Sequence, residues 1–134
     1  MPFVIRFRKP VDVADDEPYL NDCCIGGDVV LEQLLPSLRE QYGALEPTQE
    51  DWGWFVWLEH DRVHLAVDVL TQNPITSEFE IRLTSRKPSF FRSARVIDTP
   101  ELDALRSRVV AQLEAWPVVA LTVERLDQKQ LSTL

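Results

Sequence analysis

Apolar and polar residues alternate with a period of two in five stretches of the chain. The first is Phe3 to Arg8, where Phe3, Ile5 and Phe7 alternate with more polar positions. Successive side chains of a strand point to opposite faces, so this spacing predicts a strand with one buried side. The same alternation predicts four more strands, at residues 54–58, 62–70, 78–84 and 119–124.

Tryptophan is unusually concentrated in and just before the second of these stretches. Trp52, Trp54 and Trp57 lie within a few residues of one another. Tryptophan is enriched both in cores and at surfaces that contact partners. Because of the alternation, we expect Trp54 to point into the core with its apolar neighbours. Phe55 and Trp57 should then point to the opposite face, as a contact surface.

Two other segments have the spacing of helices. In the first, apolar residues recur three and four positions apart, at Leu31, Leu34, Leu35, Leu38 and Tyr42. This pattern predicts a helix over residues 28–42, with Asp28 as its N-cap and Gly43 as its stop. Pro36 should kink this helix or begin its second part, because proline lacks the N–H that the helix needs.

The second helix is predicted to begin in Asp98-Thr99-Pro100-Glu101, which combines a capping residue, an early proline and an acid in the first turn. It should continue to Pro117. The order of elements is then strand, helix, three strands, helix, strand. We therefore predict an α+β fold in a single domain over residues 1–134. It should be one mostly antiparallel sheet of about five strands, with two helices packed on one face.

Two helices cannot cover both faces of such a sheet, so one face should remain open. The alternation places charged or polar residues on that face, namely Arg6, Arg8, Arg62, His64, Asp68, Glu78, Glu80 and Arg82. Phe55 and Trp57 should lie among them. Residues 11–22 and 44–51 are expected to be acidic connections, and the basic segment 85–98 has no assignable pattern.

Charge is distributed unevenly along the chain. The formal net charge is −8, and all of the excess lies in residues 1–60, which hold 12 acids and 4 bases. An acidic protein is poorly suited to bind nucleic acid, because attraction to phosphate supplies most of that affinity. Arginines and lysine alternate with Phe90 and Phe91 in the second half, but we expect them to pair with the acidic stretch instead. No apolar run is long enough to span a bilayer, and the N-terminus turns polar too early for a secretory signal, so we expect a cytoplasmic protein.

No set of residues indicates catalysis or metal binding. Cys23 and Cys24 are adjacent and should both be reduced and structural. His60 and His64 would be about 13 Å apart on an extended strand, too far to share a metal ion. Glu78 and Glu80 have the spacing of paired carboxylates, but acids alternate on many solvated strand faces. We expect neither metal nor cofactor.

Our leading hypothesis is therefore a small acidic binding protein without catalytic activity. It would engage a protein partner through its open sheet face and acidic loops, as a neutraliser or immunity-type partner of a basic protein does. The residues expected to contact the partner are Phe55, Trp57, His64, Asp68, Glu80, Arg82, Asp12, Asp15, Asp16 and Glu17.

Two alternatives remain open at this point. One is a small-molecule site or modest enzyme around Trp52–Trp57 and His64, which predicts a deep pocket between the sheet and the helices. The other is a homodimer formed through Phe55 and Trp57.

Overall fold

The computed structural model describes residues 2–13, 18–89 and 92–126, which form one sheet and two long helices. The elements in chain order are β1 Phe3–Arg8, the short 3-10 helix η1 Asp22–Cys24, α1 Gly27–Tyr42, β2 Thr48–Glu50, β3 Gly53–His60, β4 Val63–Asn73, β5 Glu78–Ser89, β6 Arg92–Val96, α2 Pro100–Ala115 and β7 Val119–Arg125.

The sheet is antiparallel at every pairing among the described residues. Six strands follow the order β2-β3-β4-β5-β1-β7, and β6 pairs with the far end of β5. The α+β class is thus confirmed, with two more strands than predicted. One is β2, in the segment that we expected to be a connection, and the other is β6, in the segment that had no assignable pattern. Both are short and lack a full apolar alternation, so pairing with a longer neighbour is what makes them strands.

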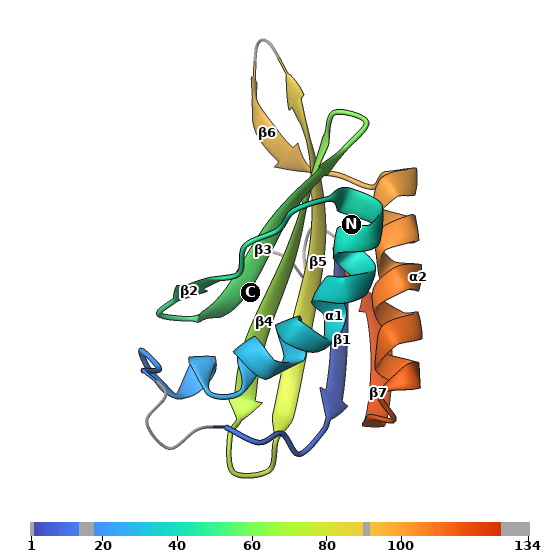
Figure 1. Ribbon diagram of the computed structural model, residues 1–134. Helices are drawn as coiled ribbons and strands as arrows, with labels where there is room; N and C mark the ends of the chain where they lie inside the picture. Colours follow the sequence, from blue (N-terminus) through green and yellow to red (C-terminus); the bar gives the residue numbers. More distant parts are fainter. Residues whose placement is uncertain (1, 14–17, 90–91, 127–134) are drawn as a thin grey trace.

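Both helices pack against the same face of the sheet. Figure 1 shows α1 and α2 side by side across it, and Arg108 of α2 donates a 3.1 Å hydrogen bond to the backbone carbonyl of Ser37 in α1. The core lies between the helices and the inward residues of the strands. Its fully buried large side chains include Ile5, Leu31, Leu34, Leu38, Leu65, Phe79, Ile81, Leu83, Leu102, Leu105 and Leu113. The period-two alternation therefore identified the buried side of β1, β3, β4 and β5 correctly. On the edge strand β7, however, Val119 and Val123 are exposed.

The tryptophan strand divides as predicted. Val56 and Leu58 are buried, and the partly buried Trp54 packs against the same core. The indole Nε1–H of Trp54 donates a 2.9 Å hydrogen bond to the carbonyl of Cys24. Trp57, on the opposite side of the strand, is 75% exposed.

The start of α1 differs from the prediction. Its N-cap is Gly26, in the left-handed region with φ of 84°, and no side chain caps the helix. Asp28 lies one residue inside α1, where its carboxylate accepts a 2.8 Å hydrogen bond from the Tyr19 hydroxyl. The prediction of Asp28 as the N-cap was wrong because the glycine begins the helix earlier. The helix also runs through Pro36 as one element rather than starting again there.

The start of α2 agrees with the predicted capping signal. The Thr99 side chain accepts a 3.1 Å hydrogen bond from the Leu102 backbone N–H, and Pro100 occupies the first turn. A tight turn follows His60. Asp61 and Arg62 both have positive φ, 50° and 65°, which suits a two-residue hairpin connection between β3 and β4.

Candidate functional site

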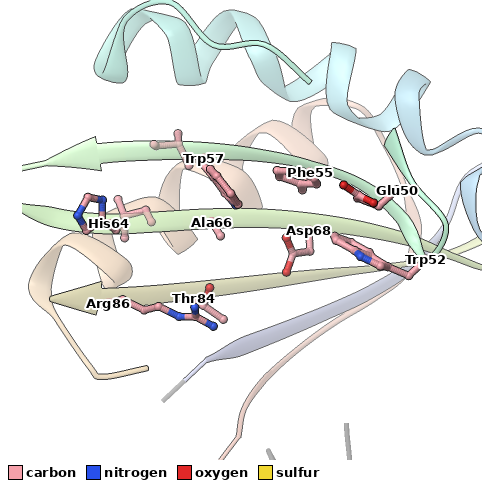
Figure 2. Close-up of a pocket in the computed structure, with 11 residues that line it drawn as sticks. Glu50, Trp52, Phe55, Trp57, His64, Ala66, Asp68, Thr84 and Arg86 are labelled. Carbon is pink, nitrogen blue, oxygen red and sulfur yellow. The ribbon is translucent and has the colours of Figure 1, made fainter. Parts of the chain in front are cut away.

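A hollow of about 600 Å³ lies on the sheet face that the helices leave open. It extends over β3, β4 and β5, as Figure 2 shows. Its lining residues are Glu50, Trp52, Phe55, Trp57, Leu58, His64, Leu65, Ala66, Asp68, Thr84 and Arg86. We call this hollow the groove.

One side of the groove is a row of three aromatic side chains. The ring centroids of Trp52 and Phe55 are 5.8 Å apart, and those of Phe55 and Trp57 are 5.1 Å apart. Phe55 and Trp57 project from the outer side of β3, and Trp52 comes from the turn between β2 and β3. Such spacings are those of interacting aromatic pairs, so the row is mutually supported although Trp57 is largely exposed.

The floor of the groove is hollow because its central side chains are small. Ala66 of β4 lies opposite Trp57 of β3 and opposite Thr84 of β5. A methyl group and a short hydroxyl side chain leave open the space that longer residues would fill. The neighbouring cross-strand pairs, His64 with Arg86 at one end and Asp68 with Arg82 at the other, carry charged or polar side chains.

Asp68 is the ionisable group of the groove most affected by its surroundings. Burial raises the pKa of its carboxyl group from 3.8 to about 6, and the nearby Arg82 and Arg86 only partly oppose this. The guanidinium of Arg82 is already engaged, at 2.7 Å from a carboxylate oxygen of Glu80. Arg86 is exposed and forms no ion pair with any residue that the structure describes. The negative charge of Asp68 is therefore incompletely balanced.

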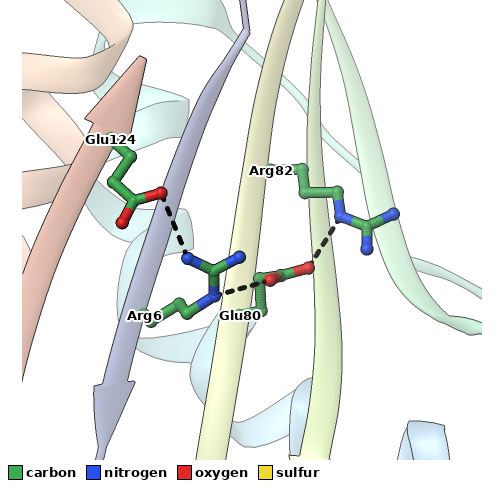
Figure 3. A network of polar contacts seen from close by, with 4 residues as sticks. All are labelled: Arg6, Glu80, Arg82 and Glu124. Carbon is green, nitrogen blue, oxygen red and sulfur yellow. Dashed lines mark hydrogen bonds and ion pairs between the residues drawn. The ribbon is translucent and has the colours of Figure 1, made fainter. Parts of the chain in front are cut away.

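Glu80 is buried and pairs with two arginines on the open face. It is 3% exposed, and its two carboxylate oxygens accept from Arg6 at 2.9 Å and from Arg82 at 2.7 Å. Glu124 of β7 extends the network with a 3.4 Å contact to Arg6 (Figure 3). Glu80 holds two arginines on the open face and is itself covered, and its expected contact with a partner stays a prediction.

Asp12 is not among the residues that line the groove. Asp12 is exposed at the end of the described segment 2–13. Asp15, Asp16 and Glu17 fall outside the described residues. Their expected contact with a partner stays a prediction.

The two cysteines differ in environment. Cys23 is exposed, whereas Cys24 is buried and its thiol donates to the Glu50 carbonyl at 2.9 Å. Burial raises the pKa of the Cys24 thiol, which favours the unreactive protonated form.

The two histidines serve different surfaces. His64 lines the groove, while His60 packs edge-on against Tyr42, with ring centroids 6.0 Å apart. His60 and Tyr42 border a second, smaller hollow of about 380 Å³ near the start of α2. Within residues 2–13, 18–89 and 92–126, no group of three or more Cys, His, Asp or Glu side chains is arranged to hold a metal ion.

Sequence reasoning placed Phe55, Trp57, His64, Asp68 and Arg82 on the open face, and the structure finds all of them there. The alternation also places Ala66 and Thr84 on the polar side of their strands, but neither they nor Arg86 were among the expected contact residues. Their only signal is the parity of each position within its strand, which becomes useful once the strand register is known.

Comparison of the sequence with family models and with characterised proteins finds no match in either case. No helix within the described part of the chain is long and apolar enough to cross a membrane.

Proposed function

We propose that this protein is a non-catalytic binding protein that engages a protein partner with the open face of its sheet. The observation that carries the proposal is the aromatic row of Trp52, Phe55 and Trp57 beside a groove that no helix covers. Interface residues that dominate binding energy are most often Trp, Tyr and Arg. A tryptophan that is 75% exposed leaves a large apolar area in water, and contact with a partner would remove it.

A macromolecular partner suits the groove better than a small molecule does. Its volume lies within the range of small-molecule pockets, roughly 300–1,000 Å³. Such pockets enclose most of their ligand, however, and the groove lies on the outer side of the sheet. The alternative of a small-molecule site or enzyme predicted a pocket between the sheet and the helices, where the described residues instead form the packed core. We keep the expectation of a cytoplasmic protein without a cofactor as part of the proposal.

Capture from a lysate of the source cells tests the proposed face with two matched variants. Trp57→Ala removes the exposed ring from the groove, and Ile75→Ala removes a side chain that is 92% exposed in the turn between β4 and β5. We expect the wild type and Ile75→Ala to capture the same partner and Trp57→Ala to lose it. Equal capture by all three proteins would show that the face is not the contact surface.

The homodimer alternative is decided by sedimentation of the same proteins. If the wild type sediments as a dimer and Trp57→Ala as a monomer, the face joins two copies of this chain. The acidic-loop part of the proposal needs a separate variant, with Asp12, Asp15, Asp16 and Glu17 all changed to neutral amides. Unchanged capture by that variant would remove the loop from the contact.

A further inference from the structure

The chemistry of the groove narrows the kind of group that it can receive. Its lining includes two carboxylates, Glu50 and Asp68, against one guanidinium, Arg86. Asp51 adds a further exposed acid in the turn beside Trp52. The chain as a whole has a net charge of −8, so its long-range field also attracts positive partners.

Asp68 and Trp57 lie on either side of the same empty space. Ala66 is directly opposite Trp57, about 5 Å away for side chains paired across strands. Asp68 is two residues from Ala66 on the same face of β4, which corresponds to about 7 Å along a strand. A group placed over Ala66 would thus lie near both the indole and the carboxylate.

We propose that the groove receives a positively charged side chain, a guanidinium or an ammonium group, from a basic segment of the partner. The group would lie over Ala66 and Thr84, between the ring of Trp57 and the carboxylate of Asp68. This inference rests on the proposed function, because it names the chemistry that the same face would recognise.

Two physical effects favour this occupant. A cation close to an exposed indole gains cation–π attraction, which increases as water is excluded from the contact. The same cation would neutralise a carboxylate that the protein already holds partly buried, with Arg82 engaged by Glu80. A group that pairs with a partly buried charge contributes more binding free energy than one that pairs with a fully solvated charge.

Arg86 is the residue that would compete with such a ligand. It lies on the same face and partly offsets the charge of Asp68, yet it is exposed and without an ion pair in the described part of the chain. Its side chain can therefore move aside when another cation arrives. Removing Arg86 should strengthen the binding of a cation and weaken the binding of an anion, so this one variant distinguishes the two.

Defined peptides test the inference without knowledge of the natural partner. Acetylated and amidated hexa-arginine and hexa-glutamate are titrated into the full chain by calorimetry, at one fixed ionic strength. We expect hexa-arginine to bind and hexa-glutamate not to bind. Asp68→Asn should weaken hexa-arginine binding on the order of tenfold, the loss expected for one charge-assisted contact. Arg86→Ala should strengthen it severalfold.

Two control variants separate the groove from the general field of an acidic protein. Asp61→Asn removes the same charge in the β3–β4 turn, outside the groove, where asparagine tolerates the positive φ. Arg8→Ala removes a positive charge on β1, also outside the groove. We expect each control to change hexa-arginine affinity less than about twofold, as a distant screened charge should. Urea unfolding of each variant shows that it is folded.

Three results would overturn the inference. Equal losses of hexa-arginine affinity in Asp68→Asn and Asp61→Asn would show that the net charge of the protein alone attracts the peptide. Binding of hexa-glutamate that Arg86→Ala abolishes would make the groove an anion site, although the face would still be a binding surface. Failure of both peptides to bind would refute the proposal that the groove receives a positively charged side chain. The proposed function would then be tested separately, by whether Trp57→Ala loses the captured partner.

Discussion

Replacing Asp68 with asparagine should stabilise the protein at pH 8 and have much less effect at pH 4. Burial raises the pKa of this carboxyl group from 3.8 to about 6, so the folded state holds the proton more tightly than the unfolded state. Protonation of Asp68 therefore stabilises the folded state of the wild type at low pH. The wild type loses this stabilisation as the pH rises from about 4 through about 6. Asparagine does not titrate and avoids the loss.

The size of the effect follows from the pKa difference. At about 1.4 kcal/mol for each pH unit, a change from 3.8 to about 6 corresponds to an upper limit of about 3 kcal/mol. Asp68 is only half-buried, and solvent screens part of this cost. We therefore expect Asp68→Asn to gain about 1–2 kcal/mol in free energy of unfolding at pH 8, relative to its effect at pH 4.

Urea unfolding followed by tryptophan fluorescence measures this difference at the two pH values. The control is Asp61→Asn, which makes the same chemical change at an exposed turn. The reasoning would be refuted if Asp68→Asn changed the free energy of unfolding equally at both pH values. A larger gain in free energy of unfolding for the wild type than for Asp68→Asn between pH 4 and pH 8 would refute it as well.

Three further predictions concern the rest of the fold. Trp54→Ala should lower the free energy of unfolding by about 2–4 kcal/mol, because it leaves a gap against the core. Trp57→Ala should change it by less than about 0.5 kcal/mol, since the side chain is largely exposed. Urea denaturation of both variants measures the difference. Glu80→Gln should lower the free energy of unfolding by about 1–3 kcal/mol, since it removes the charge that holds two arginines, and a loss no greater than that of an exposed Glu→Gln change would contradict the network. Iodoacetamide should modify Cys23 in the folded protein and reach Cys24 only in urea, which mass spectrometry of digested peptides detects; early labelling of Cys24 would argue against its burial.

Local sequence patterns were sufficient for the strands and helices whose apolar residues repeat regularly. The alternation around Trp54 and Val56 predicts both the strand and its buried side, and the leucine spacing predicts α1 to within a residue of its observed start. The capping signal at Thr99 is equally local, because the cap bonds to a backbone group three residues away. Such features depend only on near neighbours in the chain.

The less regular elements depended on contacts from distant parts of the chain. The segment 48–50 became β2 because it pairs with β3, and 92–96 became β6 because it pairs with the end of β5. Neither segment has enough apolar alternation to indicate a strand by itself. The sequence also did not predict the burial of Glu80, because that burial depends on pairing with Arg6 of the neighbouring strand β1.

The sequence by itself therefore determined that this is an α+β protein with one sheet face turned away from its helices, and that Phe55 and Trp57 lie on that face. The reason is that the direction of a side chain follows from its position within its own strand. Only the tertiary structure decided which residues meet there. The register of β3, β4 and β5 sets Ala66 and Thr84 beside Trp57, and so creates the groove. Register joins residues far apart in the chain and is fixed by packing of the whole sheet, which no local pattern records.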